Sequence, residues 1–97
     1  MVKVEKQRAM ARKFVDKIRQ DKEFQQLYDI EKKKLDIAVA LANARHQQGM
    51  TQSEVARKAR TSWETISRIE NGRLNPSLDI LSRAFAAVGK RLVFRIE

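Results

Sequence analysis

The stretch TQSEVARKARTSWETISRIENG, residues 51–72, limits the possible folds of this chain more than any other segment. Thr51 stands three residues before Glu54, an S/T-x-x-E spacing typical of a capped helix start. Ser62 has the side chain needed to cap a second helix. Gly72 follows where that helix should end, because glycine accepts the left-handed backbone conformation without strain. The stretch therefore predicts two short helices joined by a tight turn.

The second of these helices has two different faces at about 100° per residue. Two apolar side chains and one carboxylate share one side: Ile66, Ile69 and Glu70. Hydrogen-bonding side chains occupy the opposite side: Glu64, Arg68 and Asn71. An ordinary amphipathic surface helix shows the same pattern. Two capped helices around one short turn are more specific, and they favour a helix-turn-helix, which presents a helix to the major groove of DNA.

The amino-acid composition limits the classes of function that this chain can have. The 97 residues suit one small domain with an N-terminal arm. The absence of cysteine and the single histidine exclude a zinc module and favour the reducing cytosol. No apolar run approaches the roughly 20 residues of a membrane span. We also expect no enzymatic activity, cofactor, metal or small-molecule ligand, because one histidine without cysteine allows no nucleophile–base arrangement.

The charge favours a polyanionic partner. The formal net charge is +9 and the pI is near 10.4. Phosphate contacts and counterion release supply most of the non-specific affinity for nucleic acids. A merely soluble basic protein, or one that binds RNA or a membrane surface, would carry the same charge. No aromatic-rich basic strand typical of RNA stacking is present.

Further helices are expected on both sides of the motif. Residues 5–19 form a plausible amphipathic helix. Asp21 suits the cap of a short helix that carries Phe24 and Tyr28, and a long helix then runs from residue 35 to Gly49. After Pro76 and Ser77, the last helix has an expected core stripe of Leu78, Leu81, Phe85 and Val88.

The tail KRLVFRIE alternates apolar and polar residues, which predicts a strand at residues 90–97. The expected fold class is all-α: a helix-turn-helix bundle with an N-terminal helical arm and one C-terminal β-strand. A lone strand needs a partner, either the same strand of a second copy or a sheet of another protein. Leu92, Phe94 and Ile96 are the expected dimerisation residues. A disordered tail is the alternative.

From Arg45 to Gly89 the chain resembles the Cro/phage-repressor (XRE) helix-turn-helix family. The residues that carry the resemblance are Thr51-Gln52, Val55-Ala56, Ile66-Ser67-Arg68-Ile69-Glu70-Asn71-Gly72 and Asn75-Pro76-Ser77-Leu78. The resemblance implies a partly buried salt bridge between Arg45 and Glu70. An unpaired inward carboxylate would be costly, which agrees with this expectation. Arg60 replaces the usual glycine of the turn and must adopt an unfavourable backbone or shift the turn.

The resemblance also implies which residues contact DNA. Gln52, Asn71 and Arg73 match phosphate-binding positions, and Arg60 has the reach to bind a phosphate as well. Arg68 is the expected base reader, because a guanidinium pairs with the O6 and N7 acceptors of guanine. A phosphate contact or an ion pair with Glu64 is the alternative. For Trp63, packing and DNA contact are equally open. The full set of expected DNA-binding residues is Gln52, Arg60, Ser62, Trp63, Glu64, Thr65, Ser67, Arg68, Asn71 and Arg73.

The flanking segments are similar to those of HigA-type antitoxins. Asp21-x-x-Phe24-x-x-x-Tyr28 and Gly89-x-x-Leu92 carry this likeness. It implies neutralisation of a RelE-like (HigB-like) mRNA-cleaving toxin and repression of the protein's own operon. The expected toxin-binding residues are Phe14, Val15, Ile18, Phe24 and Tyr28, and packing on the protein's own core is the alternative for this stripe. RelE-like toxins are usually basic, so apolar burial would have to lead such a contact.

These expectations give three segments: a toxin-binding arm at 1–29, a DNA-binding domain at 30–89 and a strand at 90–97. The expected protein is a cytoplasmic homodimer that binds operator DNA and a toxin. Within DNA binding, the alternative is a free-standing phage-type repressor without a toxin. A protein-interaction module whose helix-turn-helix no longer binds DNA is an alternative from another class.

Overall fold

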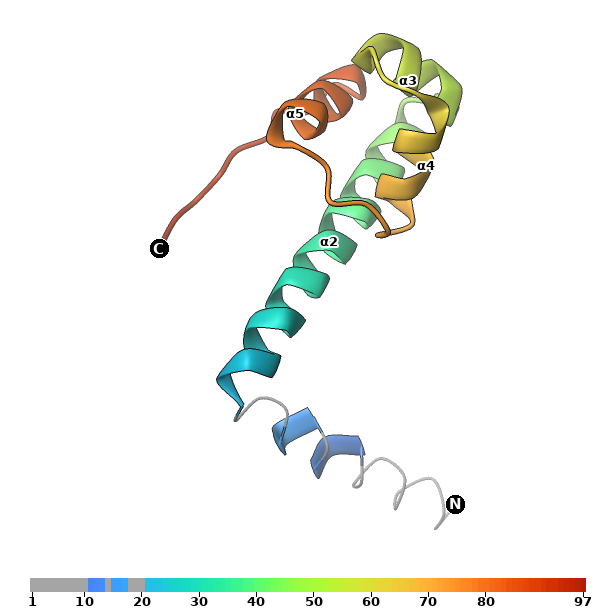
Figure 1. The fold of residues 1–97 in the computed structure, drawn as a ribbon. Helices are drawn as coiled ribbons and strands as arrows, with labels where there is room; N and C mark the ends of the chain where they lie inside the picture. Colours follow the sequence, from blue (N-terminus) through green and yellow to red (C-terminus); the bar gives the residue numbers. More distant parts are fainter. Residues whose placement is uncertain (1–10, 14, 18–20) are drawn as a thin grey trace, which may run out of the picture. The chain divides into compact units, whose positions relative to one another are not determined.

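Capping side chains set the helix starts in the computed structural model, which describes residues 11–13, 15–17 and 21–97. Three short helices each follow a hydroxyl residue that accepts a hydrogen bond from the backbone N–H three residues later, and this satisfies one orphan donor. They are α3 (Gln52–Ala59) after Thr51, α4 (Trp63–Glu70) after Ser62 and α5 (Leu78–Ala87) after Ser77. The three predicted caps are confirmed, and Figure 1 shows the helices that follow them.

The helix before the motif, α2 (Lys22–Gln47), is longer than predicted. It begins after Asp21, whose carboxylate accepts a hydrogen bond from the N–H of Glu23 at 3.0 Å. The expectation of a short helix followed by a separate one from residue 35 is wrong, because a single helix covers both. The intervening residues 29–34, DIEKKK, contain neither glycine nor proline, so nothing in the chain stops the helix there.

The chain divides into two compact units, Met1–Lys32 and Lys33–Glu97. In the first unit, residues 11–13 and 15–17 are helical, within the helix expected at residues 5–19. Every side chain whose burial is described in this unit is exposed. Phe14 and Ile18 lie outside the described residues.

The core of the second unit draws on every helix. Its largest fully buried side chains are Leu41 of α2, Val55 of α3, Ile66 and Ile69 of α4, and Val88 after α5. Helix α3 packs against both α4 and α5, as Figure 1 shows. The buried side chains of α2 and α5 thus form the part of the core on which the motif helices α3 and α4 pack.

One residue of the predicted core stripe is not in the core. Leu81, Phe85 and Val88 are buried, whereas Leu78 is 59% exposed. Leu78 is the first residue of α5, directly after the cap Ser77. The core residues of α5 begin one turn later.

The predicted C-terminal strand is wrong. Residues 90–97 have neither helix nor strand, and the described part of the chain contains no strand with which they could pair. A strand requires a neighbour for its backbone N–H and C=O groups. The alternation affects burial at one position only: Leu92 packs against the core, while Phe94 is 58% and Ile96 is 96% exposed.

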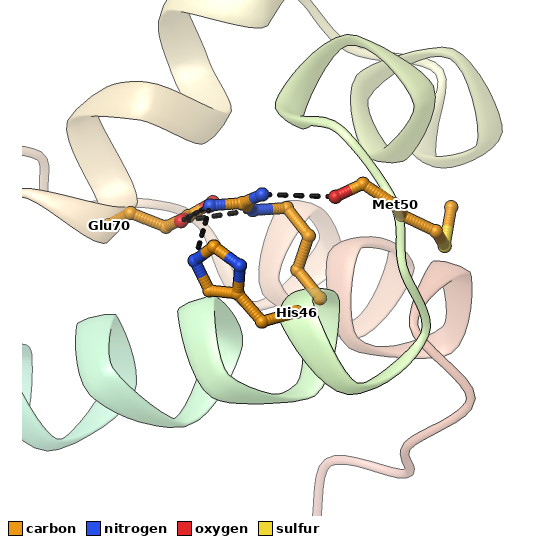
Figure 2. Close-up of polar contacts among 4 residues, drawn as sticks. His46, Met50 and Glu70 are labelled. Atoms are coloured by element: carbon orange, nitrogen blue, oxygen red, sulfur yellow. Dashed lines mark hydrogen bonds and ion pairs between the residues drawn. The ribbon is translucent and has the colours of Figure 1, made fainter.

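A partly buried ion pair fixes α4 to the end of α2 (Figure 2). Arg45 Nη2 lies 2.9 Å from Glu70 Oε1, and Arg45 Nε donates to Glu70 Oε2 at 3.0 Å. The third guanidinium nitrogen, Nη1, donates to the carbonyl of Met50 at 3.0 Å. The side chains of Arg45 and Glu70 are only 12% and 6% exposed. The pair that the resemblance implied is thus present, and it joins α2, the segment before α3 and the last residue of α4.

The turn between α3 and α4 contains a left-handed arginine. Arg60 has φ 56° and ψ 48°, so the unfavourable backbone expected for a non-glycine residue here is confirmed. Arg83 of α5 supports the turn, because its Nη1 donates to the carbonyls of Ala59 at 3.0 Å and Arg60 at 3.2 Å. A cation thus satisfies carbonyls that α3 leaves unpaired at its C-terminal end.

Replacing Arg60 by glycine should raise the free energy of unfolding by about 1 kcal/mol, because the left-handed conformation penalises a Cβ atom. Lys58→Gly is the matched control: a basic, exposed residue two positions earlier, but inside α3. That change should lower the free energy of unfolding by about 1 kcal/mol. Urea denaturation measures both. Equal destabilisation by the two glycines would contradict the strain assigned to Arg60.

Glu70→Ala should lower the free energy of unfolding by about 3 kcal/mol, because it leaves the guanidinium of Arg45 poorly solvated and without its carboxylate. The double change Arg45→Met with Glu70→Leu should cost clearly less than the two single changes together. The control is a double-mutant cycle on Arg83 and Asp79, whose carboxylate is 77% exposed. There we expect a coupling of at most about 0.5 kcal/mol. Additive effects at Arg45 and Glu70 would contradict a direct coupling.

Candidate nucleic-acid interface

Helix α4 separates its buried and exposed side chains as the helical wheel predicts. Ile66 and Ile69 are 0% and 2% exposed, and they close the core behind the helix. Glu64, Arg68 and Asn71 are exposed on the outer side. The polar side of α4 and of the residue after it is therefore free to meet a partner.

A shallow hollow, termed here the α4 hollow, lies on this outer side. Its lining residues come from α4 and the loop that follows: Trp63, Glu64, Ser67, Arg68, Asn71, Arg73 and Leu74. The structure thus brings together six of the residues expected to contact DNA. Two arginines and one glutamate give the hollow a net positive charge. The described residues include no ion pair between Arg68 and Glu64, so the guanidinium is free for another partner.

A second hollow, the α3 hollow, surrounds the start of α3. It is lined by Arg45, His46, Gly49, Met50, Thr51, Gln52, Ser53 and Trp63. Gln52 is the first residue of α3, where unpaired backbone N–H groups and the helix dipole favour an anion. Trp63 lines both hollows, so the two are neighbours on one surface. This surface combines an anion-binding end with a hydrogen-bonding helix face.

Three of the expected DNA contacts, Arg60, Ser62 and Thr65, line neither hollow. Arg60 lines neither hollow; together with Lys58 and Arg83 it borders a separate basic depression beside α5. Ser62 uses its hydroxyl as the cap of α4, at 3.2 Å from the N–H of Thr65 and 2.8 Å from its hydroxyl. Ser62 therefore has a demonstrated structural role.

Reasoning from the sequence missed two residues, one that lines this surface and one that supports the turn between α3 and α4. His46 lines the α3 hollow, with Nε2 3.3 Å from Arg45 Nη2. Its neighbour Arg45 and the nearby helix end at Gly49 were the available signals. Arg83 supports the turn from 23 residues away, and no spacing in the sequence indicates that contact.

The expected toxin-binding residues that the structure describes are exposed. Val15 is 39%, Phe24 54% and Tyr28 49% exposed, and Leu27 and Ile30 beside them are 59% and 52% exposed. These side chains do not pack into a core of their own. Phe14 and Ile18, the other two, fall outside the described residues.

Within the described ranges, no three His, Asp or Glu side chains are grouped as metal ligands. Among the helices of the described residues, none is both long and apolar enough to span a membrane.

Comparison with known proteins identifies the fold family. The helix-turn-helix family matches residues 41–94, which is more than half of the 97-residue chain. The match includes the C-terminal end of α2, all of α3, α4 and α5, and every residue that lines the two hollows. No curated protein and no solved structure matches the chain. The chain therefore belongs to the XRE-type helix-turn-helix family and is a DNA-binding regulator of that type.

Proposed function

We propose that this protein is a sequence-specific repressor that places α4 in the major groove of operator DNA. The observation that carries the proposal is the division of α4 into a buried side, with Ile66 and Ile69, and an outer side that lines the α4 hollow. A helix docked on its own core through one side can enter a groove with the other.

Arg68 is the proposed base-reading residue. Its guanidinium is exposed and lies on the outer side of α4 without an ion pair to Glu64. The fork of a guanidinium matches the O6 and N7 acceptors of guanine, and each such pair contributes about 1–3 kcal/mol of discrimination. Glu64 can accept from cytosine N4 on the same face, and the methyl group of Thr65 can contact a thymine.

The proposed phosphate contacts surround this reader. Gln52 stands at the start of α3, and Asn71 and Arg73 follow α4 on the rim of the α4 hollow. Phosphate contacts fix the register of a protein on DNA without reading the sequence. Gln52, Asn71 and Arg73 would thereby hold Arg68 at a constant depth in the groove.

A homodimer on a palindromic operator is part of the proposal. Half-sites would lie about 34–36 Å apart, one turn of DNA. Phe94 and Ile96 are the exposed residues available for pairing with a second copy, whereas Leu92 already packs on its own core.

Arg68→Ala should weaken binding to the operator by about 1–3 kcal/mol and relax specificity at one base pair, because a bidentate base contact is lost. Gln52→Ala, the matched phosphate-contact control, should weaken all sequences alike. Selection from a randomised duplex library followed by titration measures both effects. Unchanged base preference in the Arg68 variant would show that another residue reads the DNA.

We further propose that the protein is the antitoxin of a RelE-like, mRNA-cleaving toxin. The supporting observation is the exposure of large apolar side chains at the start of α2, above all Phe24, Leu27 and Tyr28. An amphipathic helix of this kind can fill an apolar groove of a partner. The free-standing phage-type repressor remains the rival, since it would repress without a toxin.

Phe24→Ala combined with Tyr28→Ala should weaken toxin binding at least about 30-fold, because buried aromatic residues dominate such interfaces. Operator affinity should stay unchanged. The test is co-purification with the product of the adjacent open reading frame, followed by titration of each partner. Leu78→Ala is the control, an exposed apolar residue outside the proposed toxin surface. If the double variant also lost operator binding, this stripe would belong to the fold; if no adjacent product bound the wild type, the lone repressor would be correct.

A further inference from the structure

Trp63 is a large apolar side chain that the core does not use. It is the first residue of α4, directly after the cap Ser62, and it is 51% exposed. The other apolar residues of the same helix, Ile66 and Ile69, are 0% and 2% exposed. The isoleucines therefore complete the core on this side of the helix, and core packing does not explain why a tryptophan stands at position 63.

The indole lies at the junction of the two hollows. On one side it lines the α3 hollow together with Gln52, and on the other it lines the α4 hollow together with Arg68. A duplex that contacts both Gln52 and Arg68 would cover Trp63. Binding would then remove a half-exposed apolar ring from water, which is favourable only against an apolar surface.

The major groove offers one such surface. Its base edges carry hydrogen-bond donors and acceptors, except for the C5-methyl group of thymine. An indole has a single N–H donor and no charge. Arginine and glutamine side chains nearby are better suited to phosphates and to polar base edges.

We propose that Trp63 is a specificity-determining residue that contacts the C5-methyl group of a thymine beside the base read by Arg68. The inference rests on the proposed function, since it requires α4 in the major groove. It adds the chemistry that is recognised: an apolar group on a base, contacted at the N-terminal end of α4.

Removing one methyl group tests this contact without changing the protein. We would select duplexes from a randomised library with the wild type, and then replace each thymine of the enriched sequence by deoxyuridine. At one thymine position, loss of the methyl group should weaken binding about fourfold, the effect of exposing one CH₂-sized group. Equal affinity for every deoxyuridine duplex would overturn the proposal.

Variants assign the contact to Trp63. Trp63→Ala should lose the thymine preference at that position and bind the deoxyuridine and thymine duplexes equally. Leu78→Ala is the matched control, because Leu78 is also the first residue of a helix and 59% exposed but lines neither hollow. That variant should keep the fourfold difference. A Trp63 variant that weakens all duplexes alike, with its base preference intact, would make the indole a backbone contact and overturn the proposal.

Trp63 is the single tryptophan of the chain, so its fluorescence provides a direct readout. Emission should change on titration with the enriched duplex and remain constant with an unrelated duplex at matched salt. Constant emission with the enriched duplex would overturn the proposal. If no sequence were enriched, both sequence-specific repression and this inference would be wrong. If a sequence were enriched but its binding did not depend on a thymine methyl group, only this inference would be wrong.

Discussion

The ion pair between Arg45 and Glu70 is the interaction on which the orientation of α4 and of its outer side depends. A carboxylate at the last residue of a helix meets the negative end of the helix dipole, and here it is also shielded from water. Among the described residues, the guanidinium of Arg45 is the cation that offsets both costs. Because residues two positions apart on a helix differ by about 200°, an inward Glu70 turns Arg68 outward. The same guanidinium binds the carbonyl of Met50, so one side chain orients α4 and the approach to α3 together.

The turn between α3 and α4 is stabilised from a distant part of the chain. Arg60 occupies a conformation that glycine adopts more easily, and its carbonyl accepts a hydrogen bond from Arg83. Arg83 belongs to α5, which also supplies core residues behind α3. Helix α5 therefore acts on the motif twice, through apolar packing and through a cation at the carbonyl end of α3. The turn between the two motif helices is therefore supported from outside the motif.

Exposure of apolar groups differs between the two units. Residues 33–97 bury a continuous core, whereas the large apolar side chains described within residues 1–32 are exposed. An exposed aromatic stripe is costly to keep in water and is typical of a surface that a partner covers. The basic charge of the chain suits DNA, while this stripe suits a partner recognised by apolar contact. Trp63 combines the two features, since it is an exposed apolar ring on the surface proposed to contact the nucleic acid.

The sequence by itself determined where α3, α4 and α5 begin and which residues lie on the two sides of α4. These features depend on hydrogen bonds three residues apart and on the 3.6-residue repeat, both of which are local. Prediction from the sequence was wrong where the structure depends on a contact with a distant residue, or where the expected contact does not form. The tail alternates like a strand, but the described residues include no strand with which it could pair. The packing of Leu92 on the core depends on side chains from other helices. Helix α2 continues through residues 29–34 because nothing interrupts it. Only the tertiary structure revealed the support from Arg83 and the place of Trp63 between two hollows, because both result from side chains that meet across separate helices.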